Sequence, residues 1–284
     1  MLTWRIGDVT ITRIVELETT GGSRFVLPDA TRDAVLPIGW LRPHFADEDG
    51  RLRMSIHALV VETPTRRIVV DTCLGNDKQG RRIPTWNDLH GPFLTDLAAA
   101  GYARETIDTV LCTHLHVDHV GWNTMLVDGR WWPTFPNARY LMGRVEYAHW
   151  RDHQEREDQR AVFADSVQPV FDAGMVYLVE TDHRIGEEIS LIPTVGHTPG
   201  HVSVRIRSRG QEALITGDFM HHPCQIARPD WASTADSDAA AARHTREHML
   251  ANLAHTPTLV IGTHFAAPTA GRIVLDGAAY RLDV

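Results

Sequence analysis

The chain has 284 residues, of which 43% are hydrophobic and 23% are charged, a composition typical of a soluble globular protein with one large domain or two small ones. Its 28 basic and 36 acidic side chains give a formal net charge of -8. The basic residues are scattered along the chain, which argues against a nucleic acid partner because phosphates are neutralised by clustered positive charge.

The sequence shows no membrane anchor and no disulfide framework. Residues 1–7 lack a long apolar run, and no later stretch approaches the roughly 20 apolar residues that a membrane span requires. Cys73, Cys112 and Cys224 form an odd set without paired spacing, as is typical of reduced thiols that pack as small hydrophobic residues. We therefore expect a cytoplasmic protein without a membrane partner.

The first hundred residues alternate strand patterns with irregular segments. Residues 3–18 predict two strands around a turn, and residues 55–61 and 67–71 predict a second, buried hairpin. Between these hairpins, residues 21–53 are rich in proline, glycine and aromatic residues, which predicts an ordered aromatic flap. A helix is expected to end near Gly101, a residue type that favours the position just after a helix.

A histidine-rich loop follows the apolar strand predicted over residues 107–112. It contains His114, His116, Asp118 and His119, with no helical spacing that would place these side chains on one solvated face. Neutral imidazole and carboxylate are ligand types that zinc-like ions prefer, so this loop predicts a metal site. The alternative is a polar surface loop that happens to be rich in histidine.

The second half of the chain returns to strands and helices. Helical patterns cover residues 145–152 and 161–171, and a helix is expected from a cap at Ser237-Asp238 to about Leu253. The strands are predicted over residues 175–179, 188–193, 201–206, 212–216 and 259–262, the last being the final clear buried strand. This order predicts an α+β protein of two similar halves with helices outside their sheets.

Three further ligand-type residues directly follow predicted strands. These residues are His197, Asp218 and His264, each with a glycine one or two positions earlier that lets the backbone approach a crowded centre. Any one of them alone is better explained as a buried histidine or turn aspartate that has found a hydrogen bond. Their recurrence with the histidine-rich loop points to one shared metal site.

The ordered set of ligand-type residues resembles that of the metallo-β-lactamase superfamily. The resemblance rests on the motif His114-x-His116-x-Asp118-His119, on His197, Asp218 and His264, and on the segments 70–72, 194–201 and 216–218. It implies a four-layer αβ/βα sandwich, here a single domain over residues 1–284. It also implies one metal on His114, His116 and His197, a second on Asp118, His119 and His264, and Asp218 as the bridge.

Seven ligands are too many for one tetrahedral zinc ion and suit two ions that share a carboxylate. No cysteine falls on a ligand position, so an all-nitrogen and oxygen site is expected, with two zinc ions or iron, manganese or cobalt as occupants. Asp71 follows a buried strand and is a candidate acceptor that orients a ligand imidazole. The other interpretation of Asp71 is a strand-end residue that caps the next turn.

The resemblance implies hydrolysis by a hydroxide that bridges the two ions, with Asp118, Asp218 and His221 in the catalytic centre and Asp118 mainly a ligand. The nearest branch contains lactonases, including acyl-homoserine lactonases, and methyl parathion hydrolase. The acyl-homoserine lactonases have a tyrosine three residues after the bridging aspartate, where this chain has His221. His221 is therefore a candidate donor to the oxyanion or leaving group, whereas His222 is expected to face solvent.

Aromatic residues near the motifs are candidates for an apolar substrate pocket, although each is also explained as a core residue. They are Trp40, Phe45, Trp86, Trp122 and Phe265. We expect a small apolar lactone or ester as substrate, in a monomer or possible homodimer. An organophosphate or aryl-ester hydrolase is the second candidate, and a non-catalytic metal-binding module is the candidate from another class. Neither the cationic cluster of a glutathione-thioester hydrolase nor the basic surface of a nuclease is evident.

Overall fold

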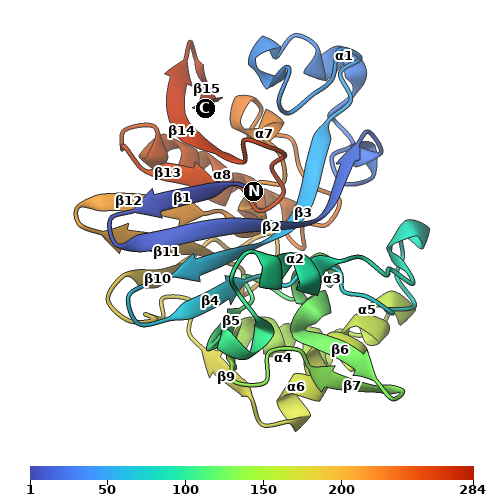
Figure 1. Cartoon of the computed structure of the whole chain (residues 1–284). Helices are drawn as coiled ribbons and strands as arrows, with labels where there is room; N and C mark the ends of the chain where they lie inside the picture. Colours follow the sequence, from blue (N-terminus) through green and yellow to red (C-terminus); the bar gives the residue numbers. More distant parts are fainter. The chain divides into compact units, whose positions relative to one another are not determined.

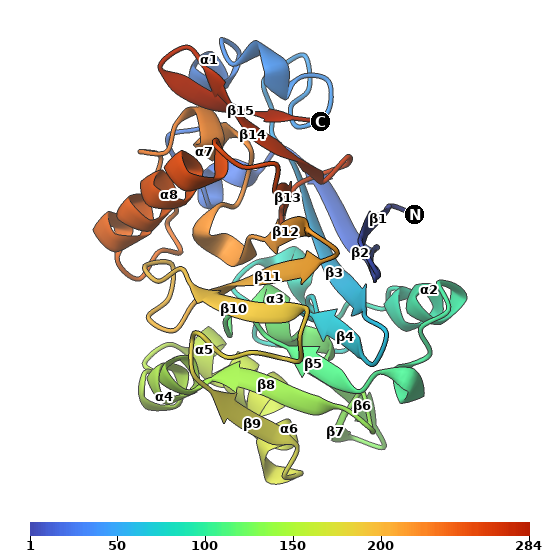
Figure 2. The same cartoon turned by 90° about the vertical axis from the view of Figure 1, so that its left-hand side faces the viewer.

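The structure, a computed structural model, describes residues 1–284. The chain divides into two compact units. The first unit contains residues 1–16 and 56–181, and the second contains residues 17–55 and 182–284. Figures 1 and 2 label the helices and strands of both units in two views. None of the helices combines the length and the apolar character that crossing a membrane would need.

The larger sheet has seven strands in the order β1-β2-β3-β4-β5-β8-β9, and the boundaries between the units fall inside β2 and β3. The strands are β1 (Thr3–Ile6), β2 (Val9–Thr20), β3 (Arg53–Glu62), β4 (Arg67–Val70), β5 (Thr109–Leu111), β8 (Arg139–Gly143) and β9 (Val176–Val179). The two predicted hairpins, β1–β2 and β3–β4, are antiparallel. Strands β4, β5, β8 and β9 are parallel, so their carboxyl ends share one edge of the sheet.

Short helices and a separate hairpin complete the first unit. They are α2 (Phe93–Ala99), α3 (Val117–Val120), α4 (Arg144–Asp152), α5 (Glu157–Val162), a π-helical turn (Phe163–Val167), α6 (Gln168–Asp172), the 3₁₀ turns Pro84–Trp86, Arg104–Thr106 and Gly121–Asn123, and strands β6 (Thr124–Val127) and β7 (Arg130–Pro133). Figure 2 shows α4 beside β8 and β9, which it contacts. The β6–β7 hairpin was not predicted, although its Asp128-Gly129 turn, with positive φ at both residues, is a strong hairpin signal.

The second unit contains a six-stranded sheet in the order β10-β11-β12-β13-β14-β15. The strands are β10 (Ile189–Pro193), β11 (Val202–Ser208), β12 (Gln211–Ile215), β13 (Leu259–Ile261), β14 (Ala270–Asp276) and β15 (Ala279–Asp283). Only the β12–β13 pair is parallel. The β14–β15 hairpin extends the sheet beyond residues 259–262, where we expected the last buried strand. Its half-exposed strands have only a short apolar run, Ile273-Val274-Leu275, so the turn at Asp276-Gly277 was the clearest signal.

The longest helix is α8 (Ala239–Leu253), which begins where the sequence predicted it. The Asp238 carboxylate accepts hydrogen bonds from the backbone N–H groups of Ala240 and Ala241, both at 3.0 Å. The helix contacts β14, as Figure 2 shows. The unit also contains α1 (Arg32–Val35), α7 (Cys224–Ala227) and the 3₁₀ turns Ser23–Phe25, Gly39–Leu41 and Gly217–Phe219.

The predicted flap over residues 21–53 is an ordered part of the second unit's hydrophobic core. Leu27, Leu41 and Phe45 are each at most 1% exposed and belong to the same buried cluster as Phe265 and Leu250. The aromatic and apolar residues of this segment therefore stabilise the unit, because burying each such side chain contributes about 1.5–3 kcal/mol.

A buried polar cluster in the first unit contains Lys78, the only lysine of the chain. Its ammonium donates to the Thr124 hydroxyl at 2.6 Å and the Asp165 carbonyl at 3.0 Å, and it lies 3.6 Å from the centroid of the Trp131 ring. Arg81 forms a bidentate ion pair with the Asp165 carboxylate, with N–O distances of 2.8 and 2.9 Å. Burial lowers the pKa of Lys78 from 10.5 to about 7, while the charge of Asp165 opposes this shift.

This depressed pKa predicts that the free energy of unfolding rises between pH 7 and 10.5. In that window the unfolded chain keeps the Lys78 proton and the folded chain has lost it, so folding releases a proton and is favoured by higher pH. The lysine signal of protein labelled with carbon-13 at lysine Cε should titrate near pH 7. Relative to Lys78→Met, the free energy of unfolding of the wild type should rise by about 3–4 kcal/mol from pH 7 to 10. A titration midpoint above pH 10 would contradict the assignment.

Candidate metal centre

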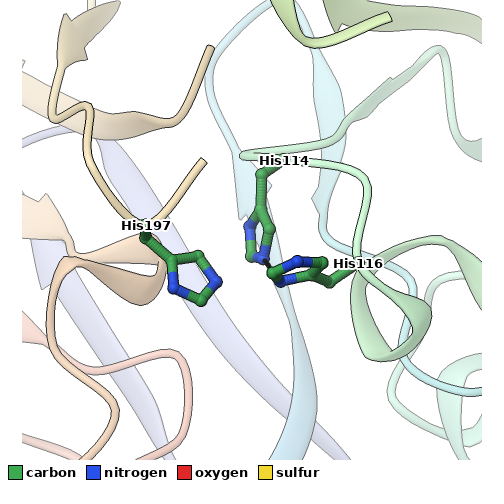
Figure 3. Close-up of side chains that lie close together, drawn as sticks. All are labelled: His114, His116 and His197. Atoms are coloured by element: carbon green, nitrogen blue, oxygen red, sulfur yellow. Dashed lines mark hydrogen bonds between the residues drawn. The ribbon is translucent and has the colours of Figure 1, made fainter. Parts of the chain in front are cut away.

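The histidine-rich loop lies at the carboxyl end of β5 and leads into α3, as predicted from the sequence. We call its four ligand-type residues, His114, His116, Asp118 and His119, the first ligand group. Nε2 of His114 lies 3.0 Å from Nδ1 of His116, and the rings of His114 and His119 are 4.0 Å apart. His114 and His119 are fully buried. Figure 3 shows the His114 and His116 rings and the hydrogen bond between them.

Asp71, at the carboxyl end of the neighbouring strand β4, stabilises this loop through hydrogen bonds. Its carboxylate accepts hydrogen bonds from the Thr113 backbone N–H at 2.8 Å and from the Thr113 hydroxyl at 2.9 Å. It also lies 2.9 Å from Nδ1 of His119. This proximity places a buried negative charge beside the His119 ring, which would stabilise a hydrogen on Nδ1 and so leave Nε2 as the ligand atom. The Thr113 hydroxyl, whose hydrogen goes to Asp71, accepts from Nδ1 of His114 at 3.1 Å.

A second buried carboxylate, Glu146 of α4, supports the same loop and was not predicted. It accepts from the Leu115 backbone N–H at 3.1 Å and from the Trp150 indole N–H at 2.6 Å. The Trp150 ring lies 5.1 Å from the His116 ring in an edge-to-face contact. Glu146 and Trp150 are four residues apart on one helix face, which was the available signal.

We call His197, Asp218 and His264 the second ligand group; they follow β10, β12 and β13. Oδ2 of Asp218 lies 3.6 Å from Nε2 of His197 and 3.2 Å from Nε2 of His264. All three residues are at most 4% exposed. Two segments that are distant in sequence therefore direct imidazole nitrogens at one carboxylate oxygen of a third. Figure 3 shows His197 on the loop after β10.

The other ring nitrogens of this group are already hydrogen-bonded. Nδ1 of His197 lies 2.9 Å from a carboxylate oxygen of Asp236, and Nδ1 of His264 lies 3.0 Å from the carbonyl oxygen of Ser55. Both partners only accept, so each Nδ1 carries a hydrogen, and each ring, when it holds no second proton, presents a lone pair at Nε2 to Asp218. Lone pairs facing a buried carboxylate repel it unless a cation or an extra proton is shared among them. The donor set therefore fits a divalent metal ion.

His221 lies in this cluster, with Nε2 3.4 Å from Oδ2 of Asp218. One ligand-type atom from each of His197, Asp218 and His221 lies within 4.8 Å of the others. Burial lowers the pKa of His221 to about 3, although the Asp218 charge acts in the opposite direction. The ring is thus neutral at pH 7 and can donate an N–H hydrogen bond without carrying a charge.

His222 is fully buried, which corrects our expectation that it faces solvent. Its Nε2 donates to the Phe45 carbonyl at 2.8 Å, and its Nδ1 accepts from the Cys224 backbone N–H at 3.0 Å. Burial lowers its pKa to about 4 despite the hydrogen bond to Phe45. The loop that follows Asp218 thus directs His222 into the interior. There the hydrogen bond from its ring to the Phe45 carbonyl holds the segment 21–53 in place.

The aromatic residues proposed for a pocket do not share one environment. Phe45 and Phe265 pack with ring centroids 6.3 Å apart in the second unit's core. Trp122 is 4% exposed, stacks on Phe93 and donates its indole N–H to Glu16 at 2.6 Å. This packing assigns these three residues to hydrophobic cores, as the alternative interpretation held. Trp40 and Trp86 are half-buried and keep some surface for a ligand.

Other polar residues that hold the second ligand group were not identified from the sequence. His201 accepts from the Asp218 backbone N–H at 2.7 Å and donates to the Thr194 carbonyl at 2.9 Å. Its place in the segment 194–201 was a signal for this role. Asp236 follows no predicted strand, so no pattern identified it. The three cysteines are buried and free, as expected.

Comparison with known proteins identifies the family. A family model for the metallo-β-lactamase superfamily matches residues 52–264, which include every residue of both ligand groups. The chain belongs to this superfamily. Its fold is the metallo-β-lactamase fold, and the predicted α+β fold class is confirmed.

Curated relatives in the superfamily are distant and only partly matched. An N-acyl homoserine lactonase from Bacillus cereus is 25% identical over 171 residues, covering 55% of this chain and 60% of the relative. A Bacillus subtilis protein, YobT, which is uncharacterised, is 29% identical over 137 residues, covering 46% of this chain and 53% of the relative. The chain thus matches somewhat more than half the length of these relatives.

Solved structures of superfamily members match nearly the whole chain. A hydrolase of the β-lactamase superfamily, AbOPH, has a TM-score of 0.80 at 25% identity and covers 100% of this chain and 97% of its own. AidC, a dizinc quorum-quenching lactonase, has a TM-score of 0.80 at 21% identity and covers 99% and 95%. At this identity, the likeness to AidC shows the fold alone.

Replacing Asp71 with alanine should destabilise the metal-free protein, because Thr113 and His119 would lose a buried charged acceptor. We expect the free energy of unfolding to fall by about 2–4 kcal/mol in urea with a chelator present. The exposed Asp172, which binds only Gln168 at 2.6 Å, provides the control Asp172→Ala, with an expected change below about 1 kcal/mol. Equal effects of both substitutions would show that Asp71 does not support the loop.

Proposed function

We propose that this protein is a dinuclear metal-dependent hydrolase that opens a lactone or cleaves a related small apolar ester. The observation that carries the proposal is the approach of Nε2 of His197 and of His264 to the buried Asp218 carboxylate while their Nδ1 atoms are hydrogen-bonded to other acceptors. Membership of the superfamily and the order of the ligand-type residues support the same conclusion.

The two ligand groups together supply seven ligands, which is sufficient for two ions with one shared carboxylate. We assign His114, His116 and His197 to one ion, Asp118, His119 and His264 to the other, and Asp218 to both. Zinc is the favoured ion because imidazole and carboxylate are ligands that it prefers. The same ligands also suit iron, manganese and cobalt, and no free cysteine lies at a ligand position. When bound, such a pair of ions supplies a hydroxide nucleophile at neutral pH and polarises the substrate carbonyl.

The protein's own side chains orient the ligand imidazoles and stabilise the developing oxyanion. Asp71 and Glu146 hold the loop of the first ligand group, so its imidazoles are oriented before any ligand arrives. His221 is neutral at pH 7, so it acts through an N–H hydrogen bond to the developing oxyanion and not as a cationic acid. Asp118 serves mainly as a ligand.

The proposed substrate class follows from the names of related proteins and from the residue at position 221. The N-acyl homoserine lactonase from Bacillus cereus and AidC, by their names, act on lactones. This chain has His221 where the acyl-homoserine lactonases have a tyrosine, so a lactone or ester without an acyl-homoserine group is favoured. Half-buried Trp40 and Trp86 are the remaining candidates for contacts with an apolar substrate.

The Asp218→Ala variant tests the shared carboxylate. Wild type stripped with a chelator and reloaded should bind about two ions per chain, whereas the variant should keep at most one. Its kcat/KM for the best lactone should fall by about three orders of magnitude or more. Metal content by mass spectrometry and initial rates provide the two measurements.

The matched control is Asp230→Ala, which removes an exposed carboxylate from the same unit and should change neither quantity. Two ions and full activity in Asp218→Ala would contradict the assignment. The substrates should include lactones, aryl esters, a phosphotriester and a chromogenic β-lactam. Turnover of the phosphotriester well above that of lactones would favour an organophosphate hydrolase, and no turnover of any of them would favour a metal-binding module.

The His221→Phe variant separates substrate activation from metal binding. We expect kcat to fall by about 10–100-fold while two ions remain bound, because the N–H donor is lost and no assigned ligand is removed. The exposed His244 gives the control His244→Phe, expected to have wild-type kcat. Unchanged kcat, or the loss of one ion, would exclude the donor role.

A further inference from the structure

Asp236 is a buried carboxylate with no role in the sequence-derived site, yet it contacts a proposed metal ligand directly. One of its oxygens lies 2.9 Å from Nδ1 of His197, and the other accepts from the Ser233 backbone N–H at 3.0 Å. Only 1% of the Asp236 side chain and none of the His197 side chain is exposed. Water therefore does not compete for this hydrogen bond.

The segment that carries Asp236 also holds the backbone of His197. The Ser237 backbone N–H donates to the His197 carbonyl, and that of Asp238 donates to the Gly196 carbonyl, both at 2.9 Å. Gly196 has φ of 126°, and a Cβ there would lie 2.2 Å from the Ala242 nitrogen of α8. The ligand loop thus packs directly on the start of α8, and His197 is restrained at both its backbone and its ring.

Arg246, on the buried face of α8, supplies the countercharge for Asp236. Its guanidinium lies 3.9 Å from the second Asp236 oxygen, and 1% of its side chain is exposed. It also donates to the carbonyl of Phe219 at 3.2 Å, next to Asp218, and to the carbonyl of Pro229 at 3.2 Å. A buried carboxylate is costly without such a partner, so Arg246 stabilises Asp236 where His197 needs its acceptor.

We propose that Asp236, supported by Arg246, is a positioning residue that sets the tautomer and orientation of His197 for metal binding. The inference rests on the proposed dinuclear function. Its carboxylate keeps the hydrogen on Nδ1, which leaves the Nε2 lone pair for the ion, and makes the imidazole a stronger ligand. Loss of such an acceptor lowers metal affinity by about 10–100-fold.

The first test uses the wild type and needs no variant. Long-range proton–nitrogen NMR spectra of the histidine rings of the metal-free protein should show His197 as the Nδ1–H tautomer. A His197 ring that carries its hydrogen on Nε2 would overturn the proposal, whatever the protein hydrolyses.

The second test is a cobalt titration of Asp236→Asn, followed by visible absorption. We expect one of two binding steps to weaken by about 10–100-fold and its absorption band to change, because the amide is a weaker acceptor without charge. Asp236→Glu, which keeps the carboxylate, should recover part of the affinity. Asp230→Asn, an exposed change of the same type, should titrate like wild type.

The outcomes separate the inference from the proposed function. Two unchanged cobalt steps and an unchanged spectrum in Asp236→Asn would overturn the positioning role while the hydrolase proposal stands. No cobalt binding by the wild type would overturn the hydrolase proposal itself. If Asp236→Asn fails to fold, the tautomer of His197 in the wild type decides the matter.

Discussion

The arrangement that most constrains this protein is the approach of imidazole lone pairs to a buried carboxylate. Nε2 of His197 and Nε2 of His264 lie 3.6 and 3.2 Å from the same oxygen of Asp218. Asp236 and Ser55 accept from the Nδ1 atoms of these rings, so each Nε2 directs a lone pair at Asp218 unless the ring holds a second proton. Such a cluster is stable with a shared cation and costly without one, which is why a metal-binding role explains the site better than packing does.

Each ligand group is held by carboxylates that are not themselves ligands. Asp71 and Glu146 accept hydrogen bonds from the backbone of the loop that carries the first group. Asp236 accepts a hydrogen bond from the ring of His197 in the second group. These acceptors come from β4, from α4 and from the segment before α8. The orientation of the imidazoles is thus set by the folded units, so that metal binding costs little rearrangement.

The sequence predicted elements well where apolar runs or caps are local. The hairpins β1–β2 and β3–β4 and the start of α8 at Asp238 formed as expected. The hairpins β6–β7 and β14–β15 were missed because their strands are short and half-exposed, leaving only an Asp-Gly turn as a signal. Trp122 follows a metal motif in sequence, yet its ring packs on Phe93, because position along the chain does not define which face a side chain occupies.

The sequence by itself determined the family and the order of the ligand-type residues, because each group of them comes shortly after a strand and strand ends are recognisable from local apolar patterns. Only the tertiary structure decided which acceptors the Nδ1 atoms of His197 and His264 meet, and that His222 and Phe45 belong to the interior. It alone revealed Asp236, which lies 39 residues from His197 in the chain. Hydrogen-bond partners of this kind are brought together by packing between distant segments, and no periodicity in the sequence records them.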